Sequence, residues 1–266
     1  MSQSTAADLH HVRRGTGKQL LLVHGLGSSW HSWDLVIDAL AAEREVIAID
    51  LPGFGDSPPL AGEVSIATLA DAIGEFLQAH ELVGVDVVGS SMGARLALEL
   101  ARRGVVGATV ALDPGGFWSA GERRAFGISV GISIRLIRLL QPLMPLLTST
   151  AVSRTLLFGQ LSARPWKLSS AMMLREMRSF SAARSVDEAL HALLAGPNQE
   201  GLPADSAKAP IVIGWGRRDL VCLPRQAPRA LALFPDARLH WFEKCGHFPQ
   251  WDQPQQTVRV ILDATR

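Results

Sequence analysis

Residues 85–103 read VDVVGSSMGARLALELARR, and this stretch determines the fold prediction. A short apolar run, VDVV, is followed by GSSMG at residues 89–93 and then by apolar residues at helical spacing. A strand that turns sharply into a helix needs glycine where the backbones crowd, and it projects the central serine hydroxyl above the sheet. The helix N-terminus directs free N–H groups toward developing negative charge. The pattern therefore identifies Ser91 as a candidate nucleophile, with a helix N-cap serine as the structural alternative.

A second copy of the same glycine and serine pattern occurs at residues 127–131, GISVG. Glycine and serine are common residues, so the pattern alone is weak evidence. The second copy follows the polar run GERRAF and has no strand pattern before it. We therefore expect Ser129 to lie inside a helix, and Ser91 stays the candidate.

Strand and helix patterns alternate along much of the chain. Short apolar runs predict strands at residues 18–23, 46–50, 85–88, 105–112, 211–215 and 238–242. Helical spacing occurs at residues 66–80, 92–103, 224–233 and about 253–264. This alternation predicts an α/β fold with a mostly parallel central sheet, and the continuous apolar strands indicate helices on both faces.

The alternation stops between about residues 115 and 205. This segment has no clear strand pattern and is rich in Leu, Met, Arg and Ser at helical spacing. Strand patterns resume after it, so we expect a helical cap inserted into one α/β core. The predicted division is residues 1–114 for the first part of the core, 115–205 for the cap and 206–266 for the second part of the core.

The composition excludes several classes of protein. Of 266 residues, 47% are hydrophobic and 19% are charged, which rules out collagen-like, disordered and disulfide-scaffold chains. The 26 Lys and Arg residues nearly balance the 25 Asp and Glu residues, so we expect no attraction to nucleic acid or to an anionic membrane. Cys222 and Cys245 have neither zinc-site nor CxxC spacing, which predicts reduced thiols in a cytoplasmic protein.

No targeting or membrane-spanning segment is expected. Residues 1–15 are polar and lack the apolar region of a secretory signal. Residues 128–147 have the length of a membrane span, but two arginines and two prolines interrupt them. We expect an amphipathic helix and no stable membrane insertion. Contact of this segment with lipid as a lid stays open, although its arginines and the neutral overall charge disfavour it. The sequence does not determine an oligomeric state.

A serine nucleophile needs a base, and the base needs an orienting acid. His247 follows the predicted strand at residues 238–242, and Asp219 follows the one at residues 211–215. Both therefore belong to the carboxyl edge of the sheet, where open α/β sheets bind ligands. Asp113 also follows a strand and is an alternative to Asp219. Other acids and histidines are expected to be surface, cap or strand residues: Asp236, Asp252 and His240.

Four blocks of sequence, in this order, resemble the α/β-hydrolase fold family. They are HGLG at residues 24–27, DLPGFGDS at 50–57, GSSMG at 89–93, and the pair around Asp219 and His247. The resemblance covers nearly the whole chain outside the cap. We interpret the DLPGFGDS segment as a tight loop whose glycines permit positive φ, and not as a phosphate cradle.

The resemblance implies a role for each matched residue. Ser91 would be the nucleophile, His247 the general base and then acid, and Asp219 the orienting carboxylate. The oxyanion hole would consist of the backbone N–H groups of Leu26 and Met92. His24 would shape the oxyanion loop. No cofactor and no metal ion are implied, and the expected partner is a small-molecule substrate.

The serine at the nucleophile position separates this chain from the dehalogenases and epoxide hydrolases of the same fold, which use aspartate there. Serine favours acyl chemistry. The first hypothesis is therefore a serine hydrolase that cleaves a small or medium carboxylic ester through an acyl-enzyme. Perhydrolysis and a triad-retaining ligand receptor with little turnover stay open.

A carbon–carbon bond hydrolase of the meta-cleavage-product type is the main alternative. Met92, the run WGR at residues 215–217 and the pair Gln250-Trp251 resemble that group. Ser90 and Phe248 depart from it, since the group usually has asparagine and tryptophan there. Such enzymes bind the substrate carboxylate with a cap arginine, for which the candidates are Arg154, Arg164, Arg175, Arg178 and Arg184.

The cap is rich in apolar residues, which suit the walls of a pocket for an acyl chain or an aromatic group. Ordinary core packing is the alternative for every candidate. The candidate substrate contacts are Trp30, Phe117, Trp118, Met144, Met173, Met177 and Phe248.

Overall fold

In the computed structural model, which describes residues 9–266, seven strands form one sheet in the order β1-β3-β2-β4-β5-β6-β7. β1 pairs with β3 in the antiparallel direction, and every other neighbouring pair is parallel. The mostly parallel α/β sheet predicted from the sequence is therefore confirmed. The sequence predicts no secretory signal in residues 1–15. Of these, residues 1–8 lie outside the described residues. The strands are His11–Arg14 (β1), Gln19–Val23 (β2), Glu45–Ile49 (β3), Asp86–Ser90 (β4), Thr109–Leu112 (β5), Ile211–Gly216 (β6) and Arg238–Phe242 (β7).

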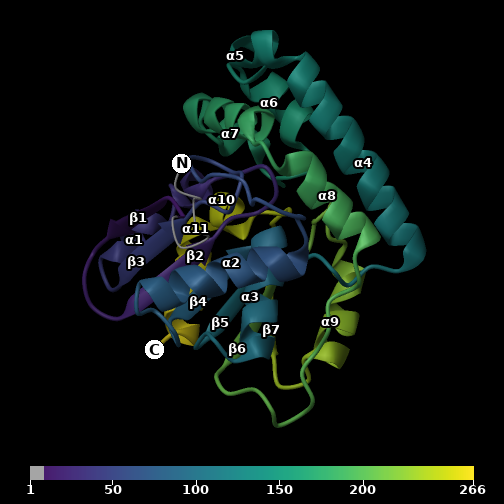
Figure 1. Ribbon diagram of the computed structural model, residues 1–266. Helices are drawn as coiled ribbons and strands as arrows, with labels where there is room; N and C mark the ends of the chain where they lie inside the picture. The colour runs from purple at the N-terminus through teal and green to yellow at the C-terminus, as the bar shows by residue number, and fades with distance from the viewer. Residues whose placement is uncertain (1–8) are drawn as a thin grey trace.

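Helices cover both faces of this sheet (Figure 1). Successive residues of β2 point to opposite faces, so Leu21 packs in one core with α2 and α3, and Leu22 packs in another with α1 and α11. α9 packs against the first face beside β6. These core helices are Ile37–Ala41 (α1), Ile66–Ala79 (α2), Met92–Arg103 (α3), Ala227–Leu233 (α9), Pro249–Asp252 (α10) and Pro254–Ala264 (α11).

Five further helices lie between β5 and β6 in the sequence and stand above the sheet as a separate layer (Figure 1). They share a small core of their own, formed by side chains such as Met144, Phe158 and Met173. The exact division at residues 115 and 205 stays a prediction. These cap helices are Ala120–Leu139 (α4), Met144–Leu147 (α5), Ala151–Phe158 (α6), Ser170–Ala182 (α7) and Val186–Ala195 (α8).

The single amphipathic helix predicted over residues 128–147 is wrong, because the chain forms separate elements there. α4 ends at Leu139, and a 3₁₀ turn, Gln141–Leu143, precedes α5. Proline is tolerated in the first turn of a helix but not in its interior, so Pro142 and Pro145 each stand in the first turn of a new element. No single helix of residues 9–266 is long and apolar enough to cross a membrane. α4 and residues 141–147 together have the length and composition, but they are bent by 68°.

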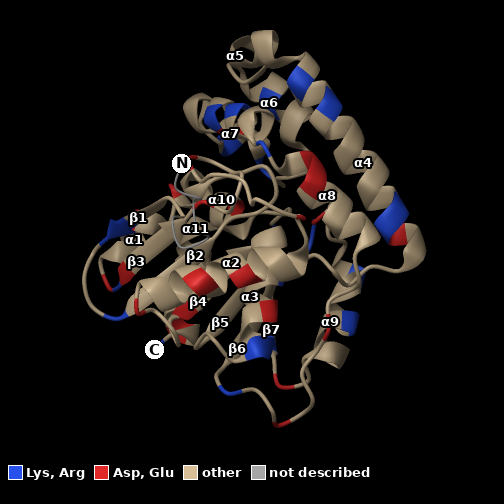
Figure 2. Ribbon diagram, in the orientation of Figure 1, with Lys and Arg blue, Asp and Glu red and all other residues tan. Residues whose placement is uncertain are grey.

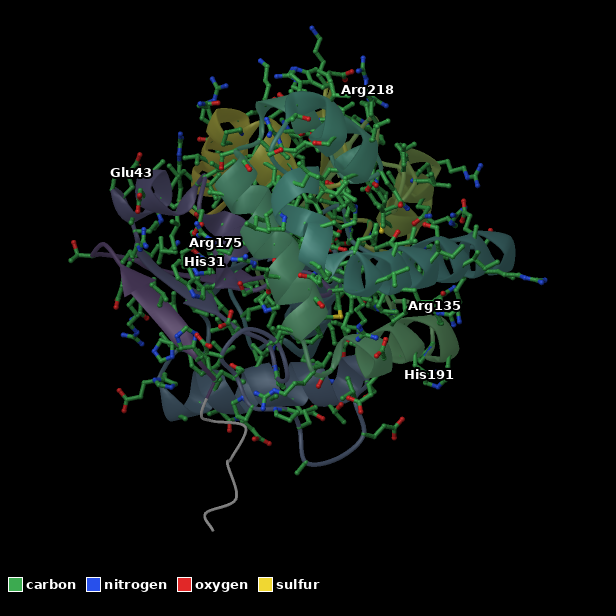
Figure 3. The ribbon with its side chains drawn as sticks, turned by 90° about the horizontal axis from the view of Figure 1, so that it is seen from above. His31, Glu43, Arg135, Arg175, His191 and Arg218 are labelled. Atoms are coloured by element: carbon green, nitrogen blue, oxygen red, sulfur yellow. The ribbon has the colours of Figure 1, made fainter. Side chains whose placement is uncertain are left out.

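Charge is distributed unevenly between the cap and the core (Figure 2). Basic residues mark α4, α6 and α7, whereas the acidic residues of the cap helices lie on α8, at the start of α4 and at Glu176 of α7. Arg175 of α7 forms an ion pair with Asp34 of the core and donates to His31 Nδ1 at 2.9 Å (Figure 3). This ion pair and hydrogen bond link the cap to the core beside the 3₁₀ turn Trp30–Trp33.

Candidate functional site

Ser91 occupies the turn between β4 and α3. Its φ of 57° lies in the left-handed region, which a non-glycine residue adopts only when its surroundings hold it there. Both flanking glycines are sterically required. A Cβ on Gly89 would lie 2.1 Å from the carbonyl oxygen of Gly93, and a Cβ on Gly93 would lie 2.2 Å from that of Val23. Ser91 stands at the N-cap position of α3, but its side chain makes no capping hydrogen bond, so capping does not account for this serine.

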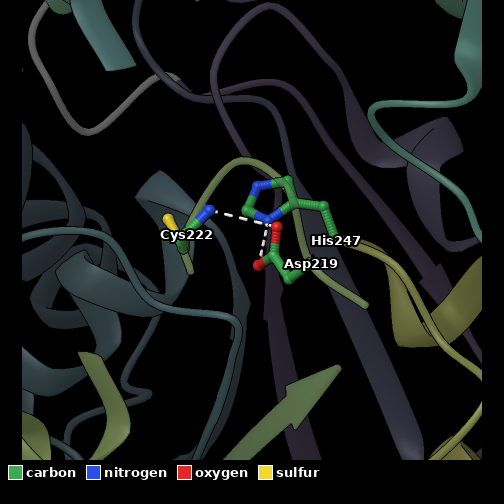
Figure 4. Close-up of side chains that lie close together, drawn as sticks. All are labelled: Asp219, Cys222 and His247. Atoms are coloured by element: carbon green, nitrogen blue, oxygen red, sulfur yellow. Dashed lines mark hydrogen bonds and ion pairs between the residues drawn. The ribbon is translucent and has the colours of Figure 1, made fainter. Parts of the chain in front are cut away.

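A chain of hydrogen bonds joins the three residues that the sequence singled out. Ser91 Oγ lies 2.8 Å from His247 Nε2. His247 Nδ1 lies 2.8 Å from Asp219 Oδ2, and Figure 4 shows these two side chains. His247 and Asp219 are buried. Because the carboxylate accepts the Nδ1 proton, the Nε2 lone pair faces the serine hydroxyl, which is the arrangement a general base requires. Their catalytic roles are part of the proposal below.

Asp219 is held in place from the other side by the backbone that follows it. Its Oδ1 accepts hydrogen bonds from the N–H groups of Val221 at 2.7 Å and Cys222 at 3.0 Å. Asp219, Cys222 and His247 also bring three possible metal-ligand atoms within 4.8 Å of one another (Figure 4). Burial raises the pKa of the Cys222 thiol well above its ordinary value, and the neighbouring Asp219 charge raises it further. A metal would need the thiolate, so these residues fit the hydrogen-bonded arrangement better.

Asp113, the alternative acid, lies behind Asp219 and makes no bond to His247 within the described part of the chain. Its Oδ1 accepts a hydrogen bond from the Gly216 N–H at 2.8 Å, and its Oδ2 has no hydrogen-bond partner among residues 9–266. Burial raises the pKa of this carboxyl well above its ordinary value, and the charge of Asp219 adds to the shift. Asp113 is therefore a buried carboxyl whose neutral form is favoured by its surroundings, whereas Asp219 is the acid that faces the imidazole.

The loop after β2 lies directly against Ser91. A Cβ on Gly25 would be 3.1 Å from the Ser91 Cβ, and Leu26 lines the cavity in front of the serine. His24 fixes this loop, since its Nε2 accepts the Leu51 N–H at 3.0 Å and its Nδ1 lies 2.7 Å from the Gly25 carbonyl oxygen. Burial lowers the pKa of His24, so the ring is neutral. Met92 begins α3, where a backbone N–H has no partner within the helix. The oxyanion role of Leu26 and Met92 stays a prediction.

A cavity of about 350 Å³ opens in front of Ser91 and His247, between the sheet and the cap. Its walls are mainly apolar, and most of them come from α4, α6 and α7. Among the described residues, Glu176 is its one acidic lining residue, and no Lys or Arg lines it. The apolar walls include Leu26, Phe126, Val130, Leu136, Ile137, Leu156, Leu157, Phe158, Leu161, Met177, Phe180, Leu193, Val221, Phe248 and Trp251.

Two of the predicted substrate contacts, Phe248 and Met177, line this cavity. The predictions for the other five are corrected, because ordinary packing occupies those side chains. Trp30 stacks on His31 with ring centroids 3.8 Å apart, and Phe117 packs between Trp215 and Phe234. The rest are buried in the core below the cap or within the cap itself: Trp118, Met144 and Met173.

Sequence reasoning missed Glu176, a buried carboxyl on the cavity wall. It accepts a hydrogen bond from Ser28 Oγ at 2.8 Å, two residues after Leu26. Burial raises the pKa of Glu176 to about 7, the Ser28 hydrogen bond opposes the shift, and the Asp34 charge adds to it. The available signal was its spacing, since Glu176 stands among Met172, Met173 and Met177 on the apolar stripe of α7.

None of the five cap arginines proposed for a substrate carboxylate lines the cavity. Arg154 donates to the carbonyl oxygens of Thr148 and Ser149, at 2.8 and 3.0 Å. Arg184 donates to the carbonyl oxygen of Ser57 at 2.9 Å. Arg175 is paired with Asp34, and the remaining two lie elsewhere on the cap: Arg164 and Arg178.

Asp252, expected to be a surface or cap residue, is buried and joins the His247 loop to the cap. Its Oδ2 accepts from the N–H groups of Gly246 at 2.7 Å and of Ala163 at 2.8 Å, and its Oδ1 accepts from the Ser162 hydroxyl. The other minor candidates lie away from the cavity, as expected. Asp236 is exposed, His240 lies in β7 next to Gln256, and Ser129 lies inside α4.

Comparison with known proteins identifies the family of the chain. Residues 20–260 match the model of the alpha/beta hydrolase family. One relative is the dihydrolipoyllysine-residue acetyltransferase component of the acetoin cleaving system of Cupriavidus necator. The chain is 30% identical to it over 259 residues, and the alignment covers 92% of this chain and 63% of that protein. The chain thus spans less than two thirds of that relative. It is 29% identical over 268 residues to 2-hydroxy-6-oxononadienedioate/2-hydroxy-6-oxononatrienedioate hydrolase 2 of Pseudomonas putida, covering 96% of this chain and 90% of that protein.

Solved structures resemble the chain over nearly its whole length. An esterase from Thermogutta terrifontis has a TM-score of 0.73 at 20% identity, covering 96% of this chain and 92% of the other. The enol-lactonase from Burkholderia xenovorans has a TM-score of 0.76 at 15% identity, covering 96% and 95%. At such identities the likeness shows the fold alone.

Proposed function

Because the chain belongs to the alpha/beta hydrolase family, we propose that it is a serine hydrolase that cleaves carboxylic esters with an uncharged, apolar acyl group. The observation that carries this proposal is the hydrogen-bond chain from Ser91 through His247 to Asp219. A nucleophile, a base and an orienting acid in this order are the parts that acyl transfer to a hydroxyl requires.

In the proposed reaction, Ser91 Oγ attacks the ester carbonyl carbon while His247 Nε2 takes the hydroxyl proton. The Leu26 and Met92 N–H groups stabilise the oxyanion, and loss of one such donor typically lowers the rate by about 10²–10³. His247 then gives the proton to the departing alkoxide, the carbon–oxygen bond breaks, and an acyl-enzyme forms. A water molecule attacks the acyl-enzyme with proton transfer to His247, which returns the proton to Ser91 as the carboxylic acid leaves.

The walls of the cavity support an uncharged substrate. A buried carboxylate is stable only beside a cation or several hydrogen-bond donors, and no Lys or Arg lines the cavity among residues 9–266. The Glu176 carboxyl, once ionised, would repel a substrate carboxylate further. The Pseudomonas putida relative is named for dioate substrates. The carbon–carbon bond alternative therefore lacks the cationic contact that such a substrate would need here.

The test compares p-nitrophenyl butyrate with p-nitrophenyl hemisuccinate, two esters of similar length that differ in a terminal carboxylate. We expect sustained turnover of the butyrate by the wild type and loss of turnover by a folded Ser91→Ala variant. We also expect kcat/KM for the hemisuccinate to be at least about tenfold lower. A folded wild type that leaves both esters intact but cleaves a vinylogous 1,5-diketone would replace this proposal with the carbon–carbon alternative.

A further inference from the structure

The outer surface of the cap exposes an unusual number of large apolar side chains. Leu139, Leu146, Val152 and Leu156 are 75%, 69%, 72% and 84% exposed. Single exposed apolar residues are normal, but a continuous set of them marks a surface that meets a partner. We call the exposed apolar residues of α4, the turn after it, α5 and α6 the cap surface: Ile128, Ile132, Leu136, Leu139, Leu143, Leu146, Val152 and Leu156.

Helical spacing gathers these residues on the solvent side of α4. Ile128, Ile132, Leu136 and Leu139 follow one another at intervals of four, four and three residues, which places them on one face. The opposite face packs into the molecule through Ile134 and Ile137. α4 is therefore apolar on both sides, and the side that carries Ile128, Ile132, Leu136 and Leu139 is largely exposed.

The same part of the chain carries a strong positive charge that the overall balance conceals. Residues 123–175 contain eight Lys or Arg and no Asp or Glu, whereas the rest of the chain has 18 basic and 25 acidic residues. The expectation of no attraction to an anionic surface rested on the net charge alone. It overlooked this separation of charge, which Figure 2 shows on α4, α6 and α7.

Part of this charge is not neutralised by the protein. Arg124 and Arg135 of α4 are exposed, and neither forms an ion pair with a carboxylate in the described part of the chain. Arg135 is labelled in Figure 3. Helical spacing places Arg135 beside Ile132 and Leu136, and Arg124 four residues before Ile128. Cationic and apolar side chains thus share the exposed face of α4.

The cap surface is continuous with the candidate active site. Leu136 and Leu156 belong to the cap surface and also line the cavity in front of Ser91. If an apolar phase touched α4 and α6, an apolar molecule that moved from it into the cavity would meet these two side chains before it reached Ser91.

We propose that the cap surface docks on an anionic phospholipid bilayer, with Arg124 and Arg135 at the head groups and the leucines and isoleucines at the edge of the acyl region. Amphipathic helices with basic and apolar residues on the exposed side bind such interfaces without spanning them. A second copy of this chain is a less suitable occupant, because two cap surfaces of the same positive sign repel each other.

The experiment is flotation of the full-length protein with two kinds of vesicle, pure phosphatidylcholine and phosphatidylcholine with about 30 mol% phosphatidylglycerol. We expect the protein to float with the anionic vesicles, and the bound fraction to fall on raising NaCl from about 0.1 to 1 M because the Debye length shortens from about 10 to 3 Å. Flotation measures binding and not catalysis, so the result does not depend on the proposed ester chemistry. Tm measurements verify that each variant is folded.

Two sets of variants separate the cap surface from general stickiness. The triple variant Leu139→Ser, Leu146→Ser, Val152→Ser removes apolar groups that do not line the cavity, and Arg124→Glu with Arg135→Glu reverses charge. Each should lower the partition coefficient on anionic vesicles at least about tenfold. The matched controls change exposed residues of the core, Val83→Ser for the first set and Arg238→Glu with Arg259→Glu for the second, and should change it less than about twofold.

Three outcomes would overturn the proposal. They are no flotation of the wild type with either vesicle, equal losses in the cap and control variants, or a dimer in light scattering that the triple cap variant converts to a monomer. The last result would assign the cap surface to a second copy of the chain. Failure of ester hydrolysis alone would leave the docking result unaffected.

Discussion

At the scale of single residues, the two buried aspartates near His247 differ in what they face. Asp219 accepts the His247 Nδ1–H, whereas Asp113 accepts the Gly216 N–H and has a pKa that burial raises well above its ordinary value. Asp219→Asn should therefore lower kcat for p-nitrophenyl butyrate by about 10⁴, because an amide favours the wrong imidazole tautomer. Asp113→Asn keeps a side-chain oxygen that can accept the Gly216 N–H and leaves the His247–Asp219 hydrogen bond in place, so it should retain kcat within about tenfold. Steady-state kinetics of both variants decide the point, and an inactive Asp113→Asn beside an active Asp219→Asn would reverse the assignment.

Glu176 makes stability depend on pH in a predictable direction. Its pKa is about 7 in the folded protein, against an ordinary value of 4.5 for glutamate, so the folded state holds the proton more tightly. The folded state loses this advantage as pH rises from about 4.5 to 7, and the free energy of unfolding falls, by on the order of 3 kcal/mol. Glu176→Gln keeps an acceptor for Ser28 and removes the titration. The variant should therefore gain stability relative to the wild type across this range.

Urea unfolding at pH 5 and pH 8 measures this effect. The exposed Glu75→Gln serves as the control and should shift the midpoint equally at both pH values. The same Glu176→Gln variant should cleave p-nitrophenyl hemisuccinate better relative to the butyrate at pH 8 than the wild type does. A stability difference between the variant and the wild type that is independent of pH would show that Glu176 does not titrate in this range.

At the scale of elements, the loop that carries His247 depends on the cap for its position. The His247 N–H donates to the Leu161 carbonyl oxygen at 2.8 Å, and Asp252 accepts from Gly246, Ala163 and Ser162. Asp252→Ala leaves these donors unpaired and should therefore destabilise the fold by about 3 kcal/mol. Because the His247 loop would lose its position, the variant should also lower kcat more than it changes KM. Thermal unfolding and kinetics test this, with the exposed Asp236→Ala as control. An Asp252→Ala variant with wild-type Tm and kcat would contradict the inferred link.

The elements also show what could be predicted from sequence and why. Strands β2 to β7 and helices α2 and α3 lie close to their predicted positions, because buried strands and amphipathic helices carry local periodic signals. The break after Leu139 was missed, since a proline that interrupts one helix and a proline that begins the next look alike in sequence. Glu176 and Asp252 were missed because their partners, Ser28 and Ala163, are distant in the chain and become neighbours only once the cap is placed.

At the scale of the whole molecule, the cavity in front of Ser91 lies between the core and the cap, which also contact each other through packed side chains and hydrogen bonds. Its walls come from both the core and the cap, so a ligand that fills it should hold the two together. The prediction uses p-nitrophenyl methylphosphonate and hexylphosphonate esters, whose phosphorus would be attacked by Ser91 Oγ with departure of nitrophenolate. Intact-mass measurement should show one adduct with the wild type and none with Ser91→Ala.

The two adducts should differ in their effect on stability, because only the hexyl chain reaches the apolar walls. Each buried methylene contributes about 0.8 kcal/mol, so the hexyl adduct should raise Tm by at least about 3 °C more than the methyl adduct. Hydrogen exchange should slow in the cap helices, residues 120–195, more than in α9, which lies outside the cavity. Equal Tm values for the two adducts would mean that the acyl chain leaves Ser91 toward solvent. The apolar cavity beneath the cap would then not be the site that selects the substrate.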